Sequence, residues 1–489
     1  MFVEDNNIYI GGTNVLPDWG QVADDGTSFS EKQQNKVRSK VIERIQKMFR
    51  DYLELDNVSF LFGTGSSIHL GAESIQNIPS AVENDVFDDK NLNISSDLKT
   101  YIQKMQNKVT KGLEEGKVIT NYGWKYAYDG EFYRNCDVKK KTIKGKKVEV
   151  VDKYGEIAVP LESLLNYLIA NLYVAEAEQD DDKTTRLKKI ISAIKKAMFN
   201  LCDVHLRTTS DRDLERIKAK GYEELFKKDK YIFHEKFLKS LLQRPLNLKR
   251  ANIFTSNYDL AFEYAFDNIG VKYIDGFSGF HHRYFKPETF DYDIFYPGST
   301  TSGKVQRIEK VVRYFKLHGS ITWIKDHDLN ASNIYGIKEL SIDLIKEKSK
   351  DSSEPFDYGN LMVYPSAVKK SYTLDLPYSE LIRQFSSAIS QPQSVLFAVG
   401  YSFCDEHFND IIYQALSNPS FTLIIVNFQK SEKSQEIQRL RDLKDPRIII
   451  LEGNDIGDFL TFSTEMMPTF TDASSSEEVI KTLETLLKK

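Results

Sequence analysis

The stretch Val58-Ser59-Phe60-Leu61-Phe62 runs directly into Gly63-Thr64-Gly65-Ser66-Ser67, and this junction decides the fold class. A short, almost continuous apolar run predicts a strand that is buried on both faces. The glycines and serines after it predict a tight turn whose backbone N–H groups can approach a phosphate closely. A buried strand followed by such a turn is typical of the first unit of a nucleotide-binding α/β domain.

More strands of this kind are expected after residue 250, and helical patterns alternate with them. The expected strands are 252–255, 311–317, 361–364, 395–399, 422–427 and 448–451, and the expected helices are 259–268, 376–390, 405–417 and 431–443. Such alternation is the pattern of a parallel sheet with helical crossovers. We therefore predict an α/β fold with a doubly wound, mostly parallel, Rossmann-like sheet.

A long segment separates the first strand from the others, and we predict that it is a large inserted helical lobe. Leucines and isoleucines recur at three- and four-residue steps across 161–245, which predicts helices. The lysine-rich stretch 139–147 is expected to form a solvated hairpin, with an anion-binding or acidic-partner patch as the alternative. The predicted division is an N-terminal segment with an amphipathic helix (1–57), a discontinuous nucleotide-binding domain (58–79 and 250–460), the inserted lobe (80–249, helical from about 161) and a C-terminal helix (461–489).

Composition excludes several functional classes. The chain has 489 residues, and 66 Lys and Arg against 71 Asp and Glu give a net charge of −5, which provides no overall field that would attract nucleic acid. No apolar run reaches the roughly 18 residues of a membrane-spanning helix, and the N-terminus lacks a signal-peptide pattern. The three cysteines, Cys136, Cys202 and Cys404, are too far apart for a cysteine-rich zinc site. We expect a cytoplasmic protein with no metal, no membrane contact and no direct nucleic-acid binding.

Four polar segments each follow an expected strand, at the end where an open α/β sheet binds its ligands. They are Gly63–Ser67 (GTGSS), Thr255–Asp259 (TSNYD), Lys316–Ser320 (KLHGS) and Gly400–Ser402 (GYS). Each segment alone has a structural alternative. The glycine segments can be tight turns, Asn257, Asp259 or Asp405 can cap helices, and His318 can be a structural histidine. All four in this order at strand ends indicate a single site.

The order of these segments resembles the sirtuin superfamily, whose members carry a GAGxS nucleotide loop, a TQNxD segment, an HG pair with the catalytic histidine and a late GxS loop. The resemblance implies that NAD binds here, that Asn257 positions a water or a ribose hydroxyl, and that His318 acts as general base. It also implies that Asp259 orients the Asn257 loop. The residues expected to contact NAD are Gly63, Thr64, Gly65, Ser67, Ser256, Asp259, Gly400, Ser402 and Asn427, and Asn454-Asp455 lies where the adenine-contacting loop is expected.

Two departures from deacetylating sirtuins change the expected activity. The stretch Leu70–Ser74 (LGAES) lacks the Phe-Arg pair that follows the nucleotide loop in those enzymes, and three cysteines cannot supply their four-cysteine zinc site. The chain is therefore more similar to the bacterial antiphage sirtuin-like proteins that deplete NAD. That resemblance implies an NAD hydrolase acting in abortive infection, a homo-oligomer, and gating by assembly or by a partner such as a HerA-like ATPase. The alternatives are an NAD-dependent protein deacylase and a non-catalytic NAD or ADP-ribose sensor.

Overall fold

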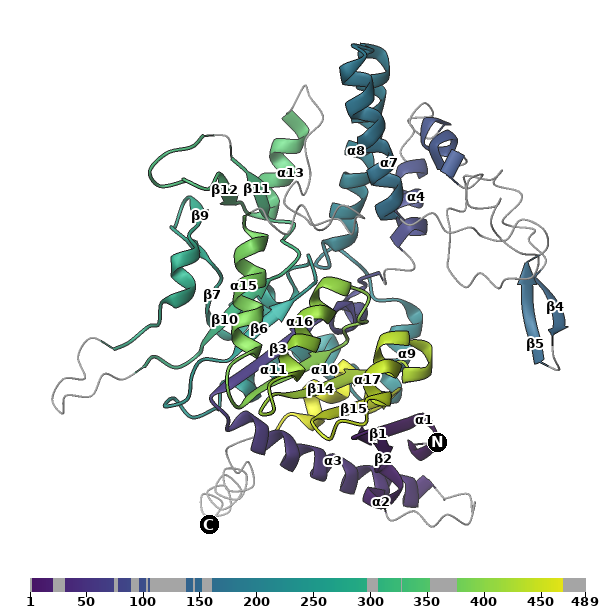
Figure 1. Ribbon diagram of the computed structural model, residues 1–489, viewed down its shortest axis with the longest axis vertical. Coiled ribbons are helices and arrows are strands. Elements are labelled where there is room, and N and C mark those ends of the chain that lie inside the picture. Colours follow the sequence, from purple (N-terminus) through teal and green to yellow (C-terminus); the bar gives the residue numbers. More distant parts are fainter. Residues whose placement is uncertain are drawn as a thin grey trace, which may run out of the picture.

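The computed structural model describes residues 2–20, 31–73, 78–88, 96–102, 104–105, 138–143, 146–151, 161–296, 307–326, 328–351 and 376–468 (Figure 1). The expected strand at 361–364 and most of the expected C-terminal helix lie outside these residues. At the start of that expected helix, α18 (Phe459–Thr461) and the π-helical turn η6 (Phe462–Met466) pack into the main core.

A nine-stranded sheet forms the centre of the described structure. Its order is β2 (Thr13–Asn14), β1 (Asn6–Ile10), β15 (Ile448–Gly453), β14 (Thr422–Asn427), β13 (Ser394–Val399), β3 (Asn57–Phe62), β6 (Asn252–Thr255), β10 (Val311–Lys316) and β7 (Lys272–Ile274). The strands from β15 to β7 are parallel, while β1 pairs antiparallel with β15. The predicted doubly wound, mostly parallel sheet is therefore confirmed.

Both faces of this sheet are covered, which explains the continuous apolar runs of its strands. In β13, Val395, Phe397 and Val399 face one hydrophobic cluster, and Leu396 and Ala398 face another. On the first face pack α3 (Glu31–Leu53), α11 (Ile232–Leu241), α12 (Ala261–Ile269) and η6. On the second face pack α15 (Tyr378–Ile389), α16 (Glu406–Leu416) and α17 (Gln435–Asp442).

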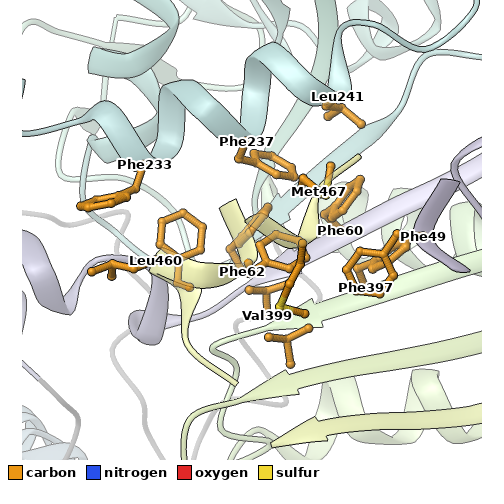
Figure 2. Packing of buried hydrophobic residues seen from close by; sticks show 14 of the residues in the cluster. Phe49, Phe60, Phe62, Phe233, Phe237, Leu241, Phe397, Val399, Leu460 and Met467 are labelled. Atoms are coloured by element: carbon orange, nitrogen blue, oxygen red, sulfur yellow. The ribbon is translucent and has the colours of Figure 1, made fainter. Parts of the chain in front are cut away.

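Phenylalanines fix α11 on the central strands, as Figure 2 shows. The ring of Phe60 stacks on Phe397 with centroids 4.8 Å apart and meets Phe237 edge-on at 5.0 Å. Phe62 contacts Phe237 at the same 5.0 Å. Such aromatic pairs add roughly 0.5–1.5 kcal/mol to the stabilisation from buried area, so they hold β3 and its following loop firmly in place.

The helices expected within 161–245 are present, and they divide into two groups. α7 (Leu161–Ala177) and α8 (Asp181–Cys202) share a separate hydrophobic cluster with α4 (Ile78–Asp88) and project away from the sheet (Figure 1). By contrast, α9 (Asp211–Ala219), α10 (Glu223–Lys228) and α11 contribute to the cluster on the sheet. The lysine-rich stretch forms β4 (Val138–Ile143) and β5 (Lys146–Val151), which pair antiparallel.

A small antiparallel sheet was not expected from the sequence. Its order is β11 (Trp323–Lys325), β12 (Ile337–Glu339), β9 (Arg283–Phe285) and β8 (Phe277–Ser278). Strands of two or three residues are too short to show a periodic pattern. This sheet contains the segment that follows His318 in the chain. Within the described part of the chain, no helix has the length and apolar character needed to cross a membrane.

Candidate functional site

The four polar segments lie side by side at the carboxyl edge of the sheet, because β13, β3, β6 and β10 are consecutive parallel strands. Backbone hydrogen bonds continue from the strands into these segments. Gly63 N donates to Val399 O at 3.1 Å, Ser256 N to Phe62 O at 3.0 Å, and Leu317 N to Thr255 O at 2.8 Å. The sheet therefore brings the predicted site together at the edge where α/β folds bind ligands.

The glycines of the first and fourth segments pack backbone against backbone. A Cβ atom on Gly63 would lie 2.6 Å from Gly400 O, and one on Gly65 would lie 2.6 Å from Gly400 Cα. Gly400 itself has a φ of +60°, in the left-handed region that favours glycine. These glycines are thus required by the contact between the two loops, whether or not they also bind a pyrophosphate.

Asn257 holds the first loop from the neighbouring strand end. Its buried side-chain Nδ2 donates to Gly63 O at 3.1 Å and lies 3.2 Å from Ser67 Oγ and 3.3 Å from Ser66 Oγ. The loop after β3 forms two short 3-10 turns, η1 (Thr64–Ser66) and η2 (Ile68–Leu70). Asn257 therefore links TSNYD to both ends of the GTGSS segment.

Asp259 is buried and lies just before the first turn of α12. Its Oδ1 accepts from Ala261 N at 3.0 Å, and its carboxylate also interacts with the hydroxyl of Ser67, which is fully buried. Burial raises the pKa of Asp259, and the neighbouring Lys316 and these hydrogen bonds oppose that rise. The geometry gives Ser67 and Asp259 internal contacts, so their predicted contacts with NAD stay predictions.

Lys316 is a buried residue of this site that sequence reasoning did not single out. Its Nζ donates to the backbone oxygen of Asp259 and lies 2.8 Å from Glu263 Oε1. Glu263 also accepts from Tyr314 at 3.1 Å, and burial raises the pKa of Glu263. A buried ammonium needs such partners, since an unpaired charge is strongly disfavoured in the interior. The sequence signal would be a lysine inside an otherwise apolar strand.

His318 contacts a carboxylate from a distant part of the chain. Its Nε2 lies 3.0 Å from Asp405 Oδ2, and its ring lies 6.1 Å from that of Tyr258 and 5.2 Å from that of Phe408. Asp405 caps α16, since its Oδ1 accepts from His407 N at 3.1 Å. The expected helix cap is therefore present, and the same carboxylate also holds the histidine.

The remaining predicted residues are more exposed than Asn257 and Asp259. Thr64 and Asn427 are half-buried and Ser402 is exposed. Asn427 Nδ2 donates to Gln429 O at 2.6 Å. Asp455, in the expected adenine-contacting loop, pairs with Arg38 at 2.5 Å and with Lys220 at 2.9 Å. Burial alone would raise the pKa of Asp455, but the two cations outweigh burial and lower it to about 2. Asp455 thus ties α3 and α9 to the loop after β15.

Two buried histidines lie directly behind the GTGSS loop. His69 in η2 and His234 in α11 stack with centroids 5.5 Å apart, among phenylalanines that include Phe233 and Phe459. Neither imidazole has a hydrogen-bond partner within the described residues. Burial lowers the pKa of His234 to about 3 and that of His69 well below its usual value.

We expect this pair to make folding stability pH-dependent. Between about pH 3 and pH 6.5 the unfolded chain protonates His234 while the folded protein does not, so stability rises with pH across this window. From pH 7 to pH 5 the loss from His234 alone should be about 2 kcal/mol, at roughly 1.4 kcal/mol per pH unit. Urea unfolding of wild type and His234→Leu at both pH values measures it. An unchanged pH slope in the variant would contradict the prediction, and the exposed His281→Leu is the control that should keep the slope.

No group of three or more His, Cys, Asp or Glu residues that could hold a metal ion occurs in the described ranges.

Residues 251–448 match the SIR2-like domain family. No curated protein matches the chain. The match covers TSNYD, KLHGS and GYS, while GTGSS precedes it and joins the same sheet through β3, between β13 and β6. Residues 251–448 are therefore identified as a SIR2-like domain, which supports the predicted sirtuin-like assignment for this part of the chain.

Proposed function

We propose that this protein binds NAD at the carboxyl edge of the sheet and hydrolyses the bond between nicotinamide and ribose. The observation that carries the proposal is the arrangement of the TSNYD and KLHGS loops. They run side by side, with Leu317 N bonded to Thr255 O and Ile321 N bonded to Tyr258 O at 3.3 Å. This arrangement presents Asn257 and His318 from adjacent strands, as a shared reaction centre requires.

The reaction requires few protein groups, because nicotinamide leaves as a neutral molecule. As the C1′–N bond breaks, its electron pair moves to the ring nitrogen and neutralises the positive charge of nicotinamide. The oxygen of a water forms the new bond to C1′, and the proton that this water loses passes to His318 as general base. The products are ADP-ribose, nicotinamide and a proton. The site mainly has to orient the ribose and stabilise the positive charge that develops on it.

The residues at the edge suit the remaining parts of NAD. The glycine loop Gly63–Gly65 would lie against the pyrophosphate, as glycine loops after a first strand do in nucleotide-binding domains. Because Gly63 N and Gly65 N already donate to Val399 O and Gly400 O, the N–H of Thr64 would be the donor to the phosphate. Ser256, Ser402 and Asn427 would contact the substrate with their polar side chains, and Gly400 lets its loop approach closely. Asn257 would use its side chain for a water or ribose hydroxyl, which requires the amide to exchange some of its loop contacts.

An enzyme that destroys NAD must be controlled, and we place this activity in abortive infection against phage. The support is the resemblance to antiphage NAD-depleting proteins and the departures from the deacetylating sirtuins in Leu70–Ser74 and in the cysteines. In this proposal a homo-oligomer or a partner such as a HerA-like ATPase gates the activity, with α7 and α8 as candidate contact elements because they project from the sheet (Figure 1).

A single assay separates the three candidate functions. Purified protein is incubated with NAD, with and without an acetyl-lysine peptide, while nicotinamide and ADP-ribose are measured. Nicotinamide release from NAD alone is expected. Release only with the peptide would replace the hydrolase with a deacylase. Binding of NAD without release, also after co-expression with neighbouring gene products, would favour a sensor, and the loop contacts of Asn257 would then be its main role.

A further inference from the structure

The segment from Gly400 to Asp405 connects the end of β13 to a carboxylate that contacts His318. It starts at the end of β13, and His318 follows β10, which lies three positions away in the sheet order β13-β3-β6-β10. At roughly 4.8 Å per strand, this is a span of about 14 Å, which six residues can cover. The Asp405 carboxylate thus reaches His318 from the loop after β13, a strand that is not a neighbour of β10.

The path of this segment is held at several points. Gly400 packs on Gly65 at its start, and Phe403, in its middle, has a φ of +56°. A left-handed conformation costs a bulky residue roughly 1–2 kcal/mol, so the surroundings must hold Phe403 in place. The Phe403 side chain is buried, and its backbone oxygen accepts from Asn409 Nδ2 at 2.8 Å. Because these contacts hold Phe403 in its left-handed conformation, the backbone that leads to Asp405 has a fixed path.

Asp405 divides its two carboxylate oxygens between two tasks. Oδ1 accepts the backbone N–H of His407 and caps α16, and Oδ2 lies 3.0 Å from His318 Nε2. A carboxylate oxygen only accepts hydrogen bonds, so the proton in this contact belongs to Nε2. In a neutral imidazole the other nitrogen, Nδ1, then carries the lone pair that can take a proton.

We propose that Asp405 is a positioning residue that holds His318 as the Nε2–H tautomer, so that Nδ1 is the base in NAD cleavage. This inference rests on the proposed function. Asp405 takes no part in bond making. It orients the ring and stabilises the imidazolium that forms when the proton of the attacking water arrives at Nδ1, which is the role of the carboxylate in serine-protease triads.

The matched substitution is Asp405→Asn. Asparagine is as good an N-cap as aspartate, so the cap of α16 can remain while the negative charge is lost. We expect kcat for nicotinamide release to fall about 10- to 100-fold, since the whole contribution of a general base is about 10²–10⁴-fold. KM for NAD should stay within about twofold. His318→Ala/Asp405→Asn should be no slower than His318→Ala alone, because residues that act as one unit are not additive. Asp410→Asn, an exposed change on the same helix, is the control.

A spectroscopic measurement tests the inference independently of activity. With ¹⁵N-labelled histidine, the His318 signals are assigned by their loss in His318→Ala. They should show a protonated Nε2 at neutral pH in wild type and a changed tautomer ratio in Asp405→Asn. An Nδ1–H tautomer in wild type, an unchanged ratio in the variant, or a kcat within twofold of wild type would overturn the proposal. If wild type releases no nicotinamide, the hydrolase proposal fails, and the tautomer measurement still decides the role of Asp405.

Discussion

His318→Ala is expected to lower the rate of nicotinamide release by about 10²–10⁴-fold, the usual contribution of a positioned general base. The substitution removes the group that receives the proton of the attacking water, and it leaves the Asp405 carboxylate without the imidazole that lies 3.0 Å away. The expected loss corresponds to about 3–5 kcal/mol of transition-state stabilisation. Because His318 is not among the predicted NAD-contacting residues, the loss should appear mainly in kcat and not in KM.

The experiment needs a histidine control, and the chain contains one. His282 is exposed in the turn between β8 and β9, so His282→Ala should leave the rate unchanged. Thermal unfolding of both variants verifies that they are folded before rates are compared. A His318→Ala rate within twofold of wild type would rule out proton transfer by this residue. Asn257→Ala, measured in parallel, should also reduce the rate, but it loosens the GTGSS loop and is a less specific test.

The central sheet was predictable because the burial of each parallel strand is visible in the residues of that strand alone. Strands such as β13 and β14 are covered on both faces, so they read as short, continuous apolar runs. The edge at which the candidate segments lie could be predicted for the same reason, since a parallel sheet collects its carboxyl ends at one edge. The order of the strands then decides which of these segments are neighbours.

Other features depend on which strands are neighbours, and one sequence does not contain that information. Asp405 could be predicted as a helix cap from its position before α16, but its contact with His318 depends on where β13 and β10 lie in the sheet. Likewise, Gly65 and Gly400 are 335 positions apart in the chain and touch only because their strands pair with one another. A glycine needed for packing and a glycine needed for a phosphate look identical in a sequence.

Gly400→Ala tests whether this contact between loops determines the shape of the site. The new Cβ would lie 2.8 Å from both Cα and C of Gly65 and 2.9 Å from Ser66 N, distances at which the backbone has to move. We expect a loss of about 1–2 kcal/mol in unfolding free energy from the left-handed φ and about 1–3 kcal/mol from overpacking. Displacing the loop by about 1 Å should also lower NAD turnover roughly 10²-fold.

Gly270 separates the two causes, because it shares the left-handed φ of Gly400 but has open space around it. Its φ is +68°, close to the +60° of Gly400, but nothing lies within 4 Å of where a Cβ would be. Gly270→Ala should therefore lose only the conformational part, about 1–2 kcal/mol, and keep its turnover of NAD. Urea unfolding of both variants isolates the clash as the difference between them. If the two variants lose equal stability and Gly400→Ala keeps its activity, the contact between the GTGSS and GYS loops does not shape the site. If Gly400→Ala loses more stability than Gly270→Ala and also loses NAD turnover, the two loops act as one unit. The packing that joins β3 to β13 then holds the nucleotide end of the site in place.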